Sequence, residues 1–179
     1  LAIAIYGYIV WLTIGLFSPE RTIRLGHASA ALSLVPLVYL MILTGGFVAG
    51  TNAGLSFPTW PLMGDSFIPP ALYRDGFVSV FEQVTTIHFN HRMLAYATGL
   101  IVVTAALHSV LRSHDLRVRI ASVLMMAAVT LQIVLGIGTV LSHVNVTIAA
   151  GHQSGAVVLL TTVLYWVHCK RTERMPSVS

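Results

Sequence analysis

The segment IASVLMMAAVTLQIVLGIGTVLSHVNVTIAAGHQSGAVVLLTTVLYWVHC, residues 120–169, contains no aspartate, glutamate, lysine or arginine. As one helix it would measure about 75 Å, more than twice the roughly 30 Å hydrocarbon core of a membrane. The polar stretch Ser142–Thr147 divides it near the middle. The segment therefore predicts two membrane-spanning helices, about 119–142 and 147–169, joined by a short turn.

Three further apolar stretches predict the remaining spans, at residues 1–17, about 28–50, and 93–111. Runs of this length favour helices over the alternating strands of a barrel. The sequence predicts an all-α integral membrane protein, with a four-helix transmembrane bundle preceded by one truncated transmembrane helix. The expected units are the truncated helix at 1–17, an inner loop at 18–27, the bundle at 28–169 with its outer loop at 51–87, and an inner tail at 170–179.

Composition excludes several other classes of protein. Hydrophobic residues make up 56% of the chain and charged residues 9%, whereas a soluble domain carries about 25% charged residues. A water-soluble globule and a disordered chain are therefore excluded. The single cysteine, Cys169, excludes an intrachain disulfide and a multi-thiolate metal site.

Basic residues predict the orientation in the membrane and account for the net charge of +4 without any nucleic acid partner. Most of them fall on one side of the predicted spans, and that side is expected to be the cytoplasm or the organelle matrix, with the C-terminus inside. They are Arg21, Arg24, Arg112, Arg117, Arg119, Lys170, Arg171 and Arg174.

His91 and His152 fall at nearly the same depth below the outer ends of two parallel spans, which are diagonal in a four-helix bundle. Two such imidazoles can hold the iron of a heme between them. Alternatively, each imidazole forms a hydrogen bond with a neighbouring helix, since an unpartnered imidazole is costly in lipid. The sequence by itself leaves both interpretations open.

Two neighbours of His91 are further candidates. His88 lies one helical turn above it and is expected at the mouth of the same site. Arg92 is placed where its guanidinium could pair with heme propionates. The alternative for Arg92 is an anchor that extends to the membrane interface.

A second histidine pair, His108 and His168, would make the chain a di-heme b-type electron carrier. Helical geometry argues against it, because His108 is rotated by about 100° from His91, and His168 by about 160° from His152. If the outer pair faces the bundle axis, the inner pair does not. One heme is therefore expected.

Several motifs resemble those of the heme A synthases, especially the proteobacterial and mitochondrial branch. In chain order they are Gly45–Gly50, Ala53–Leu55, Trp60–Gly64, Phe81–Glu82, Phe89–Leu94 and His152–Ala156. The resemblance implies eight spans in two similar halves, of which residues 28–169 would be the C-terminal half. It also implies that His91 and His152 are the axial ligands of one heme b. His88 departs from the residue that is common in the family.

The resemblance further implies an oxidoreductase that converts heme o to heme a, by oxidising the C8 methyl to formyl, for assembly of cytochrome c oxidase. In the family, the substrate-oxidising positions lie in the N-terminal half, so no catalytic residue is expected here and residues 1–179 alone are expected to be inactive. Implied partners are heme o and heme a, the lipid bilayer, heme O synthase, an electron donor and a second copy of the protein. The implied location is a bacterial inner membrane or the mitochondrial inner membrane. The alternatives are the di-heme carrier and a structural helix bundle without heme.

Overall fold

The computed structural model describes residues 1–17 and 31–173 and contains helices but no sheet in these ranges. The all-α prediction is therefore confirmed. The inner loop 18–27, the start of the 28–50 span and the end of the tail at 174–179 lie outside the described residues, as do Arg21, Arg24 and Arg174. The elements are α1 (Ala2–Leu16), α3 (Leu34–Gly50), η1 (Ala53–Leu55), η2 (Gly76–Val78), α4 (Ser79–Glu82), α5 (Val84–Arg112), α6 (Leu116–Leu141) and α7 (Val146–Arg171).

Three of the described helices, α5, α6 and α7, are long and apolar enough to cross a membrane. Helices α1 and α3 are also apolar but shorter, at 15 and 17 residues. Helix α6 begins after Asp115, whose side chain accepts the Arg117 amide. Helix α7 begins after Asn145, whose side chain accepts the amides of Thr147 and Ile148. Both are standard N-terminal caps that satisfy otherwise unpaired N–H groups.

Helix α5 begins at Val84, nine residues before the predicted span at 93–111. The backbone of Gln83 is extended and ends the outer loop. Its side-chain oxygen accepts a hydrogen bond from the Thr86 hydroxyl at 2.6 Å, and its side-chain nitrogen donates one to the Ala71 carbonyl at 2.6 Å. The helical start of α5 is thereby tied to the loop, so His88 and Arg92 lie within a regular helix.

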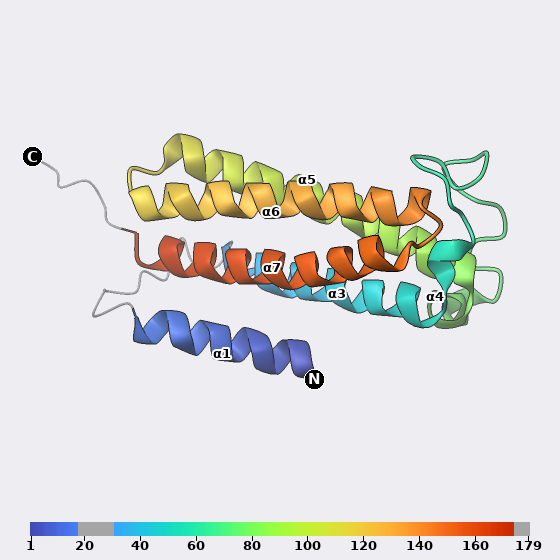
Figure 1. Ribbon diagram of the computed structural model, residues 1–179, viewed down its shortest axis with the longest axis horizontal. Helices are drawn as coiled ribbons and strands as arrows, with labels where there is room; N and C mark the ends of the chain where they lie inside the picture. The colour runs from blue at the N-terminus through green and yellow to red at the C-terminus, as the bar shows by residue number, and fades with distance from the viewer. Residues whose placement is uncertain (18–30, 174–179) are drawn as a thin grey trace, which may run out of the picture.

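Helices α3, α5, α6 and α7 pack as a ring, in which α5 and α7 each contact α3 and α6 (Figure 1). In the described part of the chain α5 and α7 share no extended contact, so they are diagonal. Helix α1 lies outside the ring along α7, where the Tyr6 and Thr161 hydroxyls are 2.8 Å apart. Below, the inner end of the ring is the end with the α5–α6 loop, and the outer end carries the loop between α3 and α5.

The apolar core occupies the inner end of the bundle. In α3 no residue after Val38 is buried, and in α6 none after Val129. In α7 the first buried residue is Leu159. On α3, α6 and α7 the outer half therefore carries only partly buried or exposed side chains, whereas the inner half is closely packed.

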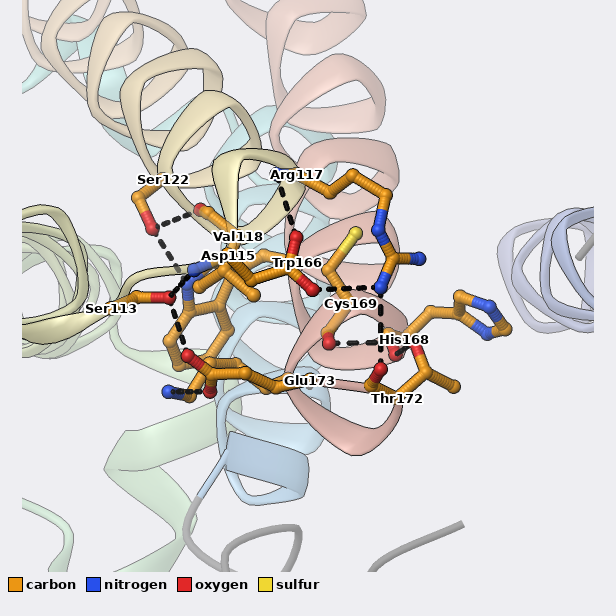
Figure 2. A network of polar contacts seen from close by, with 11 residues as sticks. Ser113, Asp115, Arg117, Val118, Ser122, Trp166, His168, Cys169, Thr172 and Glu173 are labelled. Atoms are coloured by element: carbon orange, nitrogen blue, oxygen red, sulfur yellow. Dashed lines mark hydrogen bonds and ion pairs between the residues drawn. The ribbon is translucent and has the colours of Figure 1, made fainter. Parts of the chain in front are cut away.

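Polar contacts join the helices at the inner end (Figure 2). The Trp166 indole of α7 donates to the Ser122 hydroxyl of α6 at 2.9 Å, and both side chains are buried. The Ser113 hydroxyl and the Lys170 ammonium both donate to the carboxylate of Glu173. These bonds tie α6 and the α5–α6 loop to the end of α7.

Candidate functional site

His91 and His152 approach each other from the diagonal helices α5 and α7. His91 lies seven residues after the start of α5, and His152 lies six residues after the start of α7. The corresponding depths are about 10 Å and about 9 Å. The two imidazoles are close enough to interact electrostatically. The structure thus brings together the two histidines that the sequence pairs by depth.

Helix α3 supplies the immediate surroundings of His91. The hydroxyl Oγ1 of Thr44 lies 2.9 Å from Nδ1 of His91. The next residue, Gly45, lies so close to the ring that a β-carbon there would be 3.2 Å from Cε1. Thr44 therefore forms a hydrogen bond with the imidazole, and Gly45 leaves room for the ring because it has no side chain.

Helix α6 supplies the corresponding surroundings of His152. The side-chain amide of Gln132 donates to the backbone carbonyl of His152 at 2.7 Å. One turn further along α6, Gly136 faces the ring, and a β-carbon there would be 2.9 Å from Cε1. Nδ1 of His152 is buried and has no hydrogen-bond partner in the part of the chain that the structure describes.

These residues fit a bis-histidine heme. An axial histidine supplies one ring nitrogen to iron while the other is held by a hydrogen bond. His91 meets this requirement through Thr44, which engages Nδ1 and leaves Nε2 for a metal. Nδ1 of His152 is buried without a hydrogen-bond partner among the described residues, so no bond to Nδ1 within these ranges fixes the tautomer of this ring. The absence of buried apolar side chains in the outer half of α3, α6 and α7 also fits a flat group lying between the rings.

His88 lies three residues before His91 in α5, toward the outer end, and is only 2% exposed. Its ring contacts the backbone of Ala53 in the outer loop. The Phe57 ring lies against it, with the two ring centroids 6.3 Å apart. His88 therefore joins α5 to the outer loop at the place where the sequence predicts the mouth of the site.

Arg92 binds the outer loop rather than pointing into lipid. Its guanidinium donates to the backbone carbonyls of Leu62, at 3.1 Å, and Thr59. The residue is 6% exposed, so its guanidinium is held within the protein by the outer loop. A contact with heme propionates stays a prediction.

The inner pair of histidines is not brought together. His108 lies on the exposed side of α5. His168 lies against Trp11 of α1, with ring centroids 6.0 Å apart and planes at 75°. The two therefore face different surroundings, and the described residues offer no second bis-histidine site like the one formed by His91 and His152.

The sequence reasoning missed the residues of α3 and α6 that hold the two rings, namely Thr44, Gly45, Gln132 and Gly136. Gln132 carried a signal, since it is a strongly polar side chain within the uncharged run 120–169. A threonine or a glycine in an apolar span carries none, because both are common wherever helices pack closely.

Comparison with known proteins identifies the family of the chain. The family model COX15-CtaA, described as "Cytochrome oxidase assembly protein", matches residues 1–164. The chain belongs to this family. A heme A synthase of Nitrosospira multiformis is 38% identical over 175 residues, which cover 94% of this chain and 49% of that protein. A heme A synthase of Paramagnetospirillum magneticum is 38% identical over 176 residues, with 94% and 49% covered.

The similarity extends to animals. The human heme A synthase COX15 is 35% identical over 180 residues, which cover 92% of this chain and 42% of that protein. The chain thus spans about half the length of the curated relatives it matches.

Proposed function

We propose that the ring of α3, α5, α6 and α7 binds one heme b through His91 and His152, as the C-terminal half of a heme A synthase. The observation that carries this proposal is the approach of these two imidazoles from diagonal helices at matched depth. The partners from α3 and α6 support it, because they hold each histidine while leaving one nitrogen of each for a metal.

The proposed activity of the whole protein is oxidation of the C8 methyl of heme o to a formyl group, which gives heme a for cytochrome c oxidase. The relatives that are named heme A synthases support it. A heme b with two imidazole ligands supplies one-electron transfer. The residues of this chain orient the two imidazoles and, through the inner apolar core, hold the two helices that carry them.

The proposed setting is a bacterial inner membrane or the mitochondrial inner membrane, with the C-terminus on the cytoplasmic or matrix side. The basic residues at the inner end support this orientation, since positively charged loops stay on that side. In the described ranges these residues are Arg112, Arg117, Arg119, Lys170 and Arg171. Heme O synthase as the source of heme o, an electron donor and a second copy of the protein are the proposed partners.

The heme content of the purified chain tests this proposal. The chain is expressed with heme b available and solubilised in detergent, and the ratio of heme to protein is measured together with the reduced-minus-oxidised absorption spectrum. We expect one heme per chain with a low-spin, six-coordinate spectrum. Two hemes per chain would favour a di-heme carrier, and a chain without heme would favour a structural bundle.

A further inference from the structure

The hydroxyl of Thr44 makes two hydrogen bonds that together fix the position of its only proton. Oγ1 donates to the Met41 carbonyl, three residues earlier in α3, at 2.9 Å. The same Oγ1 lies 2.9 Å from Nδ1 of His91 on α5. Because a hydroxyl has one proton and this one is directed at Met41, the oxygen can only accept from His91. Nδ1 of His91 therefore carries a hydrogen and donates it to Thr44.

This arrangement determines which nitrogen of His91 is available to a metal. A neutral imidazole protonated at Nδ1 has its lone pair at Nε2. We propose that Thr44 is a positioning residue, which selects the Nδ1–H tautomer of His91 and so presents Nε2 to the heme iron. That the metal is heme iron rests on the proposed function. The tautomer of His91 follows from the hydrogen bonds of Thr44 within the chain.

Gly45 strengthens the constraint on the same ring. A β-carbon at Gly45 would lie 3.2 Å from Cε1 of His91, which is the carbon between the two ring nitrogens. The imidazole is therefore held at its edge by Thr44 and bounded on the side of Gly45. Both residues belong to α3, so the orientation of a ligand on α5 is set from the neighbouring helix.

The two ligands are consequently inequivalent. Nδ1 of His91 donates to a hydroxyl that is itself polarised by its bond to Met41. No threonine stands in this position at His152, whose Nδ1 has no partner in the described ranges. A hydrogen bond from the remote N–H makes a ligating imidazole a stronger electron donor. With heme bound, His91 would therefore be the stronger electron donor of the two ligands and would favour ferric iron, which lowers the reduction potential.

Three variants separate this role from packing. Thr44→Val removes the hydroxyl and keeps the branched shape, whereas Thr44→Ser keeps the hydroxyl. Thr162→Val is the matched control, because the Thr162 hydroxyl on α7 makes the same bond to a carbonyl three residues earlier, that of Leu159, at 2.9 Å. Helix content by circular dichroism verifies that all three variants fold.

The tautomer is measured first, on the heme-free chain labelled with ¹⁵N-histidine. The His91 signals are assigned by their loss in His91→Gln. We expect the wild type, Thr44→Ser and Thr162→Val to show protonation at Nδ1, and Thr44→Val to show a mixture of tautomers. Protonation of His91 at Nε2 in the wild type, or an unchanged tautomer in Thr44→Val, would overturn the proposal.

The heme b complex gives the second readout. We expect Thr44→Val to bind heme roughly 10- to 100-fold more weakly, as is usual when the partner of a metal-bound histidine is lost. Its reduction potential should be more positive and its low-spin electron paramagnetic resonance signal shifted, with Thr44→Ser and Thr162→Val close to the wild type. If the wild type binds heme, and Thr44→Val binds it with the same affinity and the same reduction potential, the role of Thr44 is refuted. A wild type that binds no heme would refute the proposed function and leave the tautomer result to stand by itself.

Discussion

Gly136 of α6 lies so close to His152 of α7 that a β-carbon on it would be 2.9 Å from Cε1 and 3.5 Å from each ring nitrogen. Carbon atoms that are not bonded to each other make favourable contact at about 3.5–4.0 Å. The imidazole therefore occupies space that is available only because residue 136 has no side chain.

We predict that Gly136→Ala lowers heme occupancy and disturbs the low-spin spectrum, because the new methyl group pushes the His152 ring out of its position. The helix itself should not be weakened, since alanine is favoured over glycine in a helix by about 1 kcal/mol. Heme content, absorption spectrum and circular dichroism would be measured together.

Gly138→Ala is the matched control for this prediction. A β-carbon at Gly138 would be 3.5 Å from Cγ2 of Ile148, which is an ordinary contact. The control should keep the wild-type heme content. A Gly136→Ala protein with the wild-type spectrum would show that the His152 ring is not held where the structure has it.

Glu173 predicts a pH dependence of stability at the inner end. Partial burial by itself would raise the pKa of the Glu173 carboxyl, and the nearby Asp115 acts in the same direction. Hydrogen bonds from Lys170 and Ser113 outweigh these effects and hold the pKa below its ordinary value of 4.5 (Figure 2). A depressed pKa stabilises the folded chain when the carboxylate is ionised, so this stabilisation is complete above the ordinary pKa and is lost as the pH falls through the lower folded pKa.

The measurement is thermal unfolding of the detergent-solubilised chain between pH 7 and pH 3. We expect Glu173→Gln to be less stable than the wild type at pH 7 and the difference to shrink toward pH 3. A difference between the two proteins that stays constant over this range would mean that ionisation of Glu173 does not contribute.

The assignment of ligands predicts a clear division among the histidines. His91→Ala and His152→Ala should each abolish the six-coordinate, low-spin spectrum, because one imidazole alone leaves an axial position of the iron without its protein ligand. His108→Ala should keep the wild-type spectrum, since His108 lies on the exposed side of α5. Absorption and electron paramagnetic resonance spectra distinguish the cases. Retention of the bis-histidine signal in His152→Ala would end the assignment of that residue.

The ends of α6 and α7 could be predicted within three residues because charged residues bound the uncharged run 120–169 on both sides and the polar stretch Ser142–Thr147 divides it. The start of α5 could not be predicted from hydropathy, because its first two turns contain many polar residues. Two of their polar side chains engage the outer loop: His88 contacts Ala53, and Arg92 donates to the carbonyls of Thr59 and Leu62. Such partners depend on how the loop folds back, which no hydropathy pattern contains.

In the candidate site, the depth of a residue along the bundle could be predicted from the sequence, whereas the rotation of each helix about its axis could not. His91 and His152 could be paired because the spans fix their depth along the bundle. Thr44, Gly45 and Gly136 depend on the rotation of α3 and α6 about their own axes, which threonine and glycine in an apolar helix do not reveal. Gln132 marks one face of α6 by its polarity, but its partner on α7 is not contained in the sequence pattern. The contacts of each imidazole in the folded bundle define the roles of these four residues.

The proposed ligands also predict what residues 1–179 will not do by themselves. Two axial imidazoles leave the iron no open position, which suits electron transfer rather than oxygen activation. The chain spans about half the length of its curated relatives, and the described residues bring together one such histidine pair.

We therefore predict that cells which lack heme A synthase, make heme o and express this chain will yield heme b and heme o, but no heme a, on acid extraction and chromatography. Cells that express a full-length relative are the positive control, and spectral detection of the bound heme b shows that the chain is present and folded. Heme a in the extract of cells expressing residues 1–179 alone would mean that this bundle, with His91 and His152, itself oxidises the C8 methyl group.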